Sequence, residues 1–227
     1  MTLEKVTRPE AAQAKRRYDD ACGTAHGLEL IGERWALLVL RELMLGARRF
    51  SDLRADLPGI SANVLTQRLS ELEERGLVRR RKLPPPASVQ VYEATEWGLE
   101  AEPIVQVLGR WAARSPLHDP TMPISATSIM LSLKTMADEK KAKGFDARIG
   151  FRLGDERFVG RMRKGRFKVV RGEPTDTDFT FTGSPPQLAA VIYGGAPLDS
   201  MGFEGDPRLA AKFVTLFPLP QKAEIVR

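Results

Sequence analysis

The sequence is poor in cysteine and histidine and has no long apolar run. Its 227 residues include one cysteine, Cys22, and two histidines, His26 and His118. A lone cysteine excludes an internal disulfide, and these three residues lack the spacing of a metal site. No apolar stretch approaches the roughly 18–20 residues needed to span a bilayer, and the N-terminal residues lack the apolar centre of a secretion signal. These absences predict a cytoplasmic protein with no metal, no cofactor and no membrane partner.

Catalytic motifs are missing as well. The sequence has no Gly-x-Ser-x-Gly elbow, no glycine-rich phosphate loop and no dinucleotide-binding fingerprint. We therefore predict that the chain is not an enzyme. The net charge of +6 is compatible with a polyanionic partner, but it is spread over both halves of the chain. Local patches must therefore identify any such partner.

The first half of the sequence predicts three helices in a row. Apolar residues recur at helical spacing over residues 25–46 and again over 50–57. Pro58-Gly59 ends the second of these helices. Residues 60–76 form a third helical pattern, for which Ser61 is a suitable N-cap.

A hairpin and one more helix follow. Residues 77–83 and 89–94 alternate as strands do, and three prolines and two small residues join them. Thr95 is suited to cap a helix over residues 96–114, which Pro103 should kink.

A proline-rich stretch separates this part from the rest of the chain. Residues 115–123 contain three prolines, which is typical of a linker. Beyond it we expect helices over 125–143, from Ser184 and from Asp206, and an antiparallel sheet of strands 147–153, 157–163, 166–171 and 177–182. The predicted organisation is a flexible arm (1–17), an N-terminal domain (18–115), a linker (116–123) and a C-terminal domain (124–227).

The third helix is the most informative element. Leu65, Leu69 and Leu72 repeat at helical spacing and should face a core, while short polar side chains fall on the opposite face. Such side chains contribute little to a core but can hydrogen-bond to base edges and phosphates. On its own, this pattern would usually be the solvent-exposed face of an ordinary amphipathic helix. A helix and a tight turn precede it here and a basic hairpin follows, which predicts a winged helix-turn-helix domain that binds double-stranded DNA.

The hairpin begins with four consecutive cations, which strand alternation would direct to both faces, so that about half could meet phosphate at once. The helix ends add further candidates. The predicted DNA contacts are Arg48, Arg49, Ser61, Asn63, Thr66, Gln67, Arg68, Ser70, Arg79, Arg80, Arg81 and Lys82.

Several of these segments resemble one known family. Residues 32–43 (GERWALLVLREL), 49–53 (RFSDL), 58–61 (PGIS), 65–69 (LTQRL) and 76–79 (GLVR) are similar to HxlR-type winged helix-turn-helix regulators, and the similarity continues to about residue 114. The resemblance implies transcriptional regulation by a homodimer on a palindromic operator. It also implies that the first and last helices of the domain make the dimer contacts.

Cys22 lies where this family often has a cysteine, which in some members senses oxidants or electrophiles. In the family a proline follows it, whereas Gly23 follows here. Asp19 and Asp20 are its nearest charged neighbours, and acids raise the pKa of a thiol. An inert cysteine and a redox cysteine both remain open, with the inert one favoured.

The second half resembles the sterol carrier protein lipid-binding fold, in which a sheet and its helices enclose an apolar tunnel. Strand alternation gives six candidates for lining such a space: Phe151, Phe158, Met162, Phe167, Phe179 and Phe181. The simpler reading is that they fill a core. The expected fold is α+β, with the winged domain followed by a sterol-carrier-like domain that binds an apolar small-molecule effector or supports the dimer.

A second function remains open from the sequence. The chain could be a lipid- or acyl-binding module whose N-terminal half mainly dimerises. The recognition-helix pattern favours the DNA-binding alternative.

Overall fold

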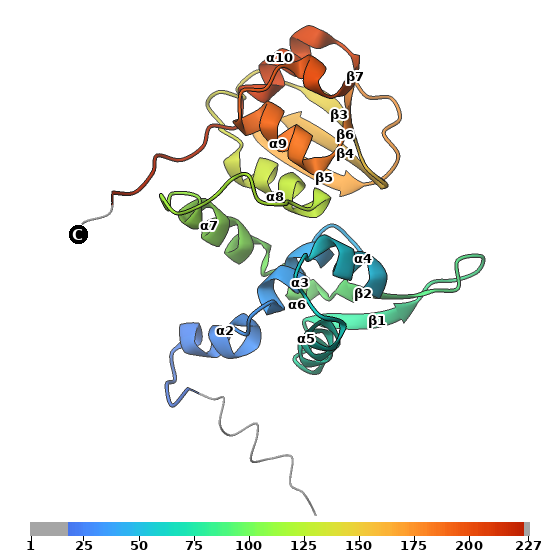
Figure 1. Ribbon diagram of the computed structural model, residues 1–227, viewed down its shortest axis with the longest axis vertical. Helices are drawn as coiled ribbons and strands as arrows, with labels where there is room; N and C mark the ends of the chain where they lie inside the picture. The colour runs from blue at the N-terminus through green and yellow to red at the C-terminus, as the bar shows by residue number, and fades with distance from the viewer. Residues whose placement is uncertain (1–17, 225–227) are drawn as a thin grey trace, which may run out of the picture.

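A computed structural model describes residues 18–224 and shows them in two halves packed one on the other (Figure 1). The predicted arm, residues 1–17, lies outside the described residues. The N-terminal half contains α2 (Gly23–Ile31), α3 (Ala36–Leu43), α4 (Phe50–Asp56), α5 (Ala62–Glu74), β1 (Val78–Lys82), β2 (Gln90–Ala94), α6 (Glu96–Leu99) and α7 (Glu102–Ala112). The C-terminal half contains α8 (Ala126–Met136), β3 (Ala147–Leu153), β4 (Glu156–Arg163), β5 (Arg166–Arg171), β6 (Phe179–Gly183), α9 (Pro185–Tyr193), a 3-10 turn (Leu198–Ser200), β7 (Gly202–Gly205) and α10 (Pro207–Val214).

The long helix expected over residues 25–46 is wrong, because it is two helices. The chain leaves the helix after Ile31, and Trp35 takes a left-handed backbone conformation with φ 78° before α3 begins. A tryptophan rarely adopts this conformation, so tertiary packing must support it. Its side chain is half-buried against the core, and a Cβ atom at position 59, where Gly59 stands, would lie 3.8 Å from its ring.

Two other helices differ from their predicted length. The helix expected over residues 96–114 is interrupted as α6 and α7, and Pro103 occupies the first turn of α7, where a proline is tolerated. The helix expected over 125–143 ends at Met136. The Asp138 carboxylate then accepts the backbone N–H groups of Lys140 and Lys141 at 2.9 and 3.0 Å, which forms a turn in place of further helix.

Other elements agree with the sequence. Thr95 accepts the Gly98 N–H at 3.0 Å as the cap of α6, and Ser184 and Asp206 cap α9 and α10. β1 and β2 pair antiparallel from Val78–Ala94 to Lys82–Gln90, forming the wing that projects to the right in Figure 1.

The C-terminal sheet has the strand order β5-β4-β3-β6-β7 and is mixed, not antiparallel as expected. β3 and β6 run parallel, and the other neighbours are antiparallel. The chain reaches β6 from the edge strand β5 by crossing the outer face of the sheet. Pro174, in this crossing, is buried at Gly150, where a Cβ atom would lie 2.6 Å from it. Such a crossing delivers the next strand in a parallel direction.

The helices α8, α9 and α10 cover one face of this sheet (Figure 1). Aromatic rings fill the space between the sheet and α10. All six residues considered for a ligand space are buried. Phe151, Phe179 and Phe181 contact Phe213 of α10, with ring centroids 5.6–6.4 Å apart. These residues contribute to a core, as the simpler of the two interpretations of the sequence predicts.

α8 joins the two halves. It contacts α3 and α7 on one side and β5 and α9 on the other (Figure 1). Its buried residues are Ala126, Thr127, Ile129, Met130, Leu131, Leu133 and Met136. The buried apolar residues of both halves consequently form one continuous cluster.

Candidate nucleic-acid interface

The helix α5 is anchored by leucines and capped at both ends. Leu65, Leu69 and Leu72 are fully buried, as their spacing predicts. The Ser61 hydroxyl accepts the Val64 N–H at 3.3 Å, so the predicted N-cap is confirmed. Gly76, with φ 73°, ends the helix in the left-handed conformation that glycine adopts at little cost.

The polar stripe of α5 faces solvent. Asn63, Thr66, Gln67 and Ser70 are all exposed. The Gln67 side-chain amide donates to Glu71 one turn further along, at 3.0 Å. An exposed row of short donors and acceptors on a firmly anchored helix is the arrangement that can enter a major groove.

Arg68 does not share this face, which corrects its predicted role as a phosphate contact. It is 6% exposed, and its guanidinium pairs with Glu71 at 2.6 Å and with Glu33 at 3.3 Å. Position 68 lies three residues after Leu65 and four before Leu72, so it shares their inward side of the helix. Its pairing with Glu33 ties α5 to the turn before α3.

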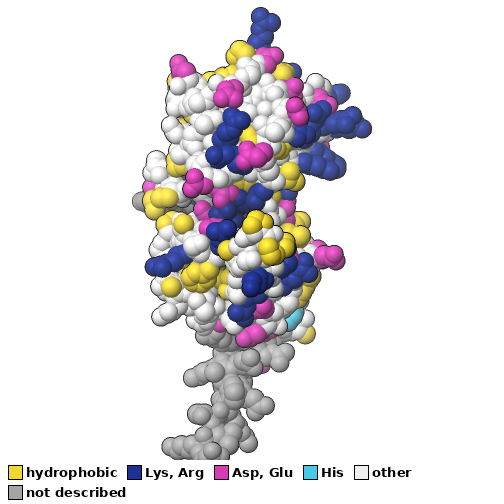
Figure 2. All heavy atoms as spheres, turned by 90° about the vertical axis from the view of Figure 1, so that its right-hand side faces the viewer, with side chains coloured by type: hydrophobic (Ala, Val, Ile, Leu, Met, Phe, Trp, Pro, Cys, Tyr) yellow, Lys and Arg dark blue, Asp and Glu magenta, His cyan; other side chains and the backbone are white. Residues whose placement is uncertain are grey.

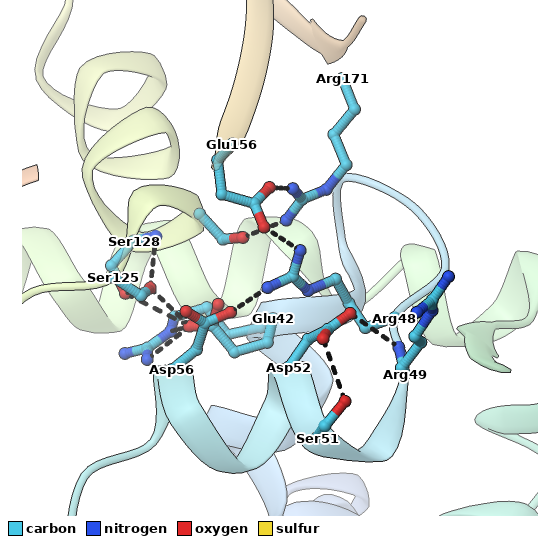
Figure 3. Close-up of polar contacts among 12 residues, drawn as sticks. Glu42, Arg48, Arg49, Ser51, Asp52, Asp56, Ser125, Ser128, Glu156 and Arg171 are labelled. Atoms are coloured by element: carbon cyan, nitrogen blue, oxygen red, sulfur yellow. Dashed lines mark hydrogen bonds and ion pairs between the residues drawn. The ribbon is translucent and has the colours of Figure 1, made fainter. Parts of the chain in front are cut away.

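Arg48 is a second correction. It is 8% exposed, and its guanidinium pairs with Asp56 at the end of α4 and with Glu156 of the C-terminal half (Figure 3). Its backbone forms a two-way bridge with Tyr92, with both N–O distances 2.8 Å. Its neighbour Arg49 is exposed at the start of α4.

The wing places its cations in pairs with acids. Arg79 and Arg81 both donate to Glu93, at 2.6 and 3.0 Å, from one face of the hairpin. Arg80 pairs with Glu73 of α5 at 2.9 Å. All four cations from Arg79 to Lys82 are exposed, and a groove of about 560 Å³ is lined by Arg80, Arg81, Lys82, Ser88 and Gln90. Viewed from the wing side, Lys and Arg side chains are interspersed with Asp and Glu (Figure 2).

These pairs shift the acids toward their charged forms. The hydrogen bond from Arg80 lowers the pKa of Glu73. Partial burial would raise the pKa of Glu93, but the hydrogen bonds from Arg81 and Arg79 lower it overall. Sequence reasoning missed both acids, although Glu93 lies directly opposite Arg79 in the hairpin register. At neutral pH the four wing cations therefore lie beside two carboxylates, Glu93 of the wing and Glu73 of α5.

An apolar stripe runs along α7. Ile104, Val107, Leu108 and Trp111 fall at helical positions i, i+3, i+4 and i+7, and all are exposed, Trp111 by 70%. No residue of α7 is buried, and the nearby Trp97 and Leu99 are exposed as well. α2 likewise buries none of its residues. Apolar surface of this extent on soluble proteins commonly marks an interface.

Cys22 is exposed at the N-cap of α2. Its pKa is lowered from 9.0, chiefly because the Thr24 backbone amide, the Thr24 hydroxyl and the Ala25 amide hydrogen-bond to the sulfur. The expectation that Asp19 and Asp20 would raise this pKa is therefore wrong, because the start of the helix supplies closer donors. The inert role that the sequence favours and the redox alternative both stay predictions.

Within residues 18–224 no group of His, Cys, Asp and Glu side chains is arranged to hold a metal ion. No helix of the described chain is long and apolar enough to cross a membrane.

Comparisons with known proteins agree with this geometry. Residues 30–118 match the model of the HxlR-like helix-turn-helix family. The chain is 40% identical to the uncharacterized HTH-type transcriptional regulator YkvN of Bacillus subtilis over 94 residues, which cover 40% of this chain and 77% of the relative. It is 36% identical to the HTH-type transcriptional regulator YodB of the same organism over 83 residues, 37% of this chain and 74% of that one. The chain belongs to the HxlR-like helix-turn-helix family.

Among solved structures, the reduced form of YodB from B. subtilis has a TM-score of 0.39 with this chain at 31% identity, covering 44% of this chain and all of that one. The family model ends at residue 118, so the C-terminal half lies beyond it. Its resemblance to sterol carrier proteins stays a prediction.

Proposed function

We propose that this HxlR-like chain is a sequence-specific DNA-binding transcriptional regulator that acts as a homodimer. The observation that carries the proposal is the exposed polar stripe of α5 beside the basic wing. α5 would lie in the major groove, where its side chains meet base edges, and the wing would follow the adjacent backbone. The contacts that we propose are Arg49, Ser61, Asn63, Thr66, Gln67, Ser70, Arg79, Arg80, Arg81 and Lys82.

The wing arginines are held in place before DNA arrives. Each of Arg79, Arg80 and Arg81 has a carboxylate partner, so binding exchanges an internal ion pair for a phosphate contact. Exposed pairs of this kind contribute little to stability and are easily exchanged. These ion pairs reduce the net positive charge of the wing and therefore its sequence-independent attraction to phosphate. Discrimination between DNA sequences then depends more on α5.

Substitution of residues in the polar stripe of α5 tests whether this helix recognises the base sequence. A target duplex is first selected with the wild-type protein from a random-sequence pool. In the variant Asn63→Ala/Gln67→Ala, we expect affinity for this duplex to fall by about 1–3 kcal/mol for each lost base contact, with binding to unrelated duplex nearly unchanged. Thr182→Ala, an exposed polar change in the C-terminal half, serves as the control. A stripe variant that footprints like the wild type would refute the recognition role.

The dimer part of the proposal rests on the apolar stripe of α7. Two copies related by a two-fold axis could cover these stripes together and present two copies of α5 to a palindromic operator. Val107→Asp, at a position 69% exposed, should leave the monomer folded and shift it out of the dimer in light-scattering measurements. A wild-type protein that is monomeric at micromolar concentration would contradict this part.

For an apolar effector, we propose a site other than the interior of the C-terminal sheet. The aromatic side chains of the C-terminal sheet pack on one another, which gives no support to the lipid-carrier alternative. A cleft of about 450 Å³ lies between the halves. Its lining combines the apolar residues Pro58, Pro123, Ile124, Leu153 and Pro185 with the charged residues Arg48, Asp52, Asp56, Asp155 and Glu156, so an effector here would need both an apolar body and a polar group. Ligand sites often occupy such clefts between domains.

Native mass spectrometry tests the effector part. We expect a hydrophobic adduct on the purified protein, or uptake of added fatty acid, that is reduced when Ala55→Leu fills the cleft. A clean mass with no uptake would exclude an apolar effector and leave the DNA-binding proposal intact.

A further inference from the structure

An ionic junction connects the two halves of the molecule (Figure 3). We use this name for Arg48, Asp56, Glu156 and Arg171. The Arg48 guanidinium donates to both Asp56 and Glu156, and the Arg171 guanidinium pairs with Glu156 from the opposite side. Arg171 also donates to the Thr127 hydroxyl of α8 at 2.7 Å. Glu156, at the start of β4, thus lies between an arginine from each half.

The junction is largely withdrawn from water. The side chain of Arg48 is 9% exposed, and those of Glu156 and Arg171 are each 20% exposed. Burial, followed by the neighbouring charge of Arg48, lowers the pKa of Arg171 to about 10. Arg171 also lies over the Phe158 ring, 4.8 Å from its centroid. The charges of the junction stabilise one another, because removal of one would leave another charge unpaired away from water, which costs free energy.

Arg48 links this junction to the DNA-reading elements. Its backbone pairs with Tyr92 of β2 through an isolated bridge, so it is hydrogen-bonded directly to the hairpin that forms the wing. Its side chain holds Asp56, the last residue of α4, and only Leu57–Ser61 separate α4 from α5. One residue therefore joins the wing, through its backbone, to the helix that leads into the recognition helix, through its guanidinium.

A second polar contact joins the same two halves nearby. Glu42 of α3 has a fully buried side chain and accepts the hydroxyl of Ser125, the N-cap of α8, at 2.8 Å. The cleft between the halves is lined in part by Arg48, Asp56 and Glu156. The junction thus borders the cleft on one side.

We propose that Glu156 is a positioning residue for DNA recognition: together with Arg171 it holds Arg48, and through Arg48 it fixes the wing relative to α4 and α5. The C-terminal half then sets operator affinity without touching DNA. This inference rests on the proposed function, because it concerns the same DNA-binding surface. Its basis is the contact of one buried arginine with the wing sheet, α4 and the C-terminal half.

The test compares Glu156→Gln with the neighbouring change Asp155→Asn in the full chain. Both positions line the cleft and lie in one hairpin, but only Glu156 contacts Arg48. Binding is measured to the duplex selected by the wild-type protein and to an unrelated duplex of equal length. We expect Glu156→Gln to weaken binding to the selected duplex about fivefold or more, as coupling between sites typically does. Binding to the unrelated duplex, and both affinities of Asp155→Asn, should remain within about twofold of the wild type, because a looser arrangement mainly affects base contacts.

Other outcomes would overturn the inference. Equal affinities of Glu156→Gln and the wild type would do so, as would an equal loss on both duplexes, which is what a smaller folded fraction produces. If Glu156→Gln does not fold by circular dichroism, Thr127→Val decides. It removes only the hydroxyl that holds Arg171, and a selective loss in the same direction is expected, whereas unchanged selectivity would refute the proposal. A wild-type protein that enriches no duplex would instead refute DNA recognition itself.

Discussion

Cys22 has hydrogen-bond donors around its sulfur that favour the thiolate. Because its pKa is lowered from 9.0, the thiolate fraction near neutral pH exceeds that of an ordinary cysteine. We expect the rate of iodoacetamide alkylation to rise with pH through a midpoint below 9.0. Thr24→Val, which removes the hydroxyl but keeps the amide, should move the midpoint upward. Since this is the only cysteine in the chain, all of the alkylation reports on Cys22. A midpoint at or above 9.0 would contradict the prediction.

Single arginines show where residue-level prediction succeeds and fails. The exposure of the wing cations follows from their place in a hairpin, and the burial of Arg68 could have been read from its spacing to Leu65 and Leu72. The burial of Arg48 could not. Its partner Glu156 lies 108 residues away, and no local pattern indicates such a pairing.

Among the elements, β4 shows at Gly160 how closely the inner face of the C-terminal sheet is packed. A Cβ atom there would lie 2.6 and 2.7 Å from the Phe167 ring and 3.1 Å from Phe151. Gly160→Ala should therefore lower the free energy of unfolding by about 1–3 kcal/mol, as overpacking of a core does. Urea denaturation measures this, with Gly172→Ala, where a Cβ atom would meet nothing within 4 Å, as the matched control. A variant as stable as the wild type would imply that the rings are loosely packed.

Elements with local signals were the ones the sequence could predict. Ser61, Thr95, Ser184 and Asp206 cap helices where expected, since capping depends on a few neighbouring residues. The parallel pairing of β3 with β6 was not predictable, because it depends on the route of the chain over the sheet. The break before α3 is also not predictable, since the apolar spacing continues across it; in the structure residues 32–35 leave the helix and Trp35 takes a positive φ.

The whole molecule has one continuous core, which should determine how it unfolds. α8 contributes buried residues to both halves, so neither half can lose it without exposing apolar surface. We expect a single calorimetric transition with equal calorimetric and van't Hoff enthalpies. Two resolved transitions would show that the halves are stable independently and that α8 belongs to only one of them.

The shared helix also bears on where this protein can be cut for engineering. A DNA-reading fragment that stops at the proline-rich stretch would leave α3 and α7 without the helix they pack against, and the remainder would keep α8 with one side bare. A transplanted reading unit should extend through Met136, with the outward apolar side chains of α8 replaced by polar ones. For a chimaera, the chain should therefore be divided after α8, which packs against both halves, and not within the proline-rich residues 115–123.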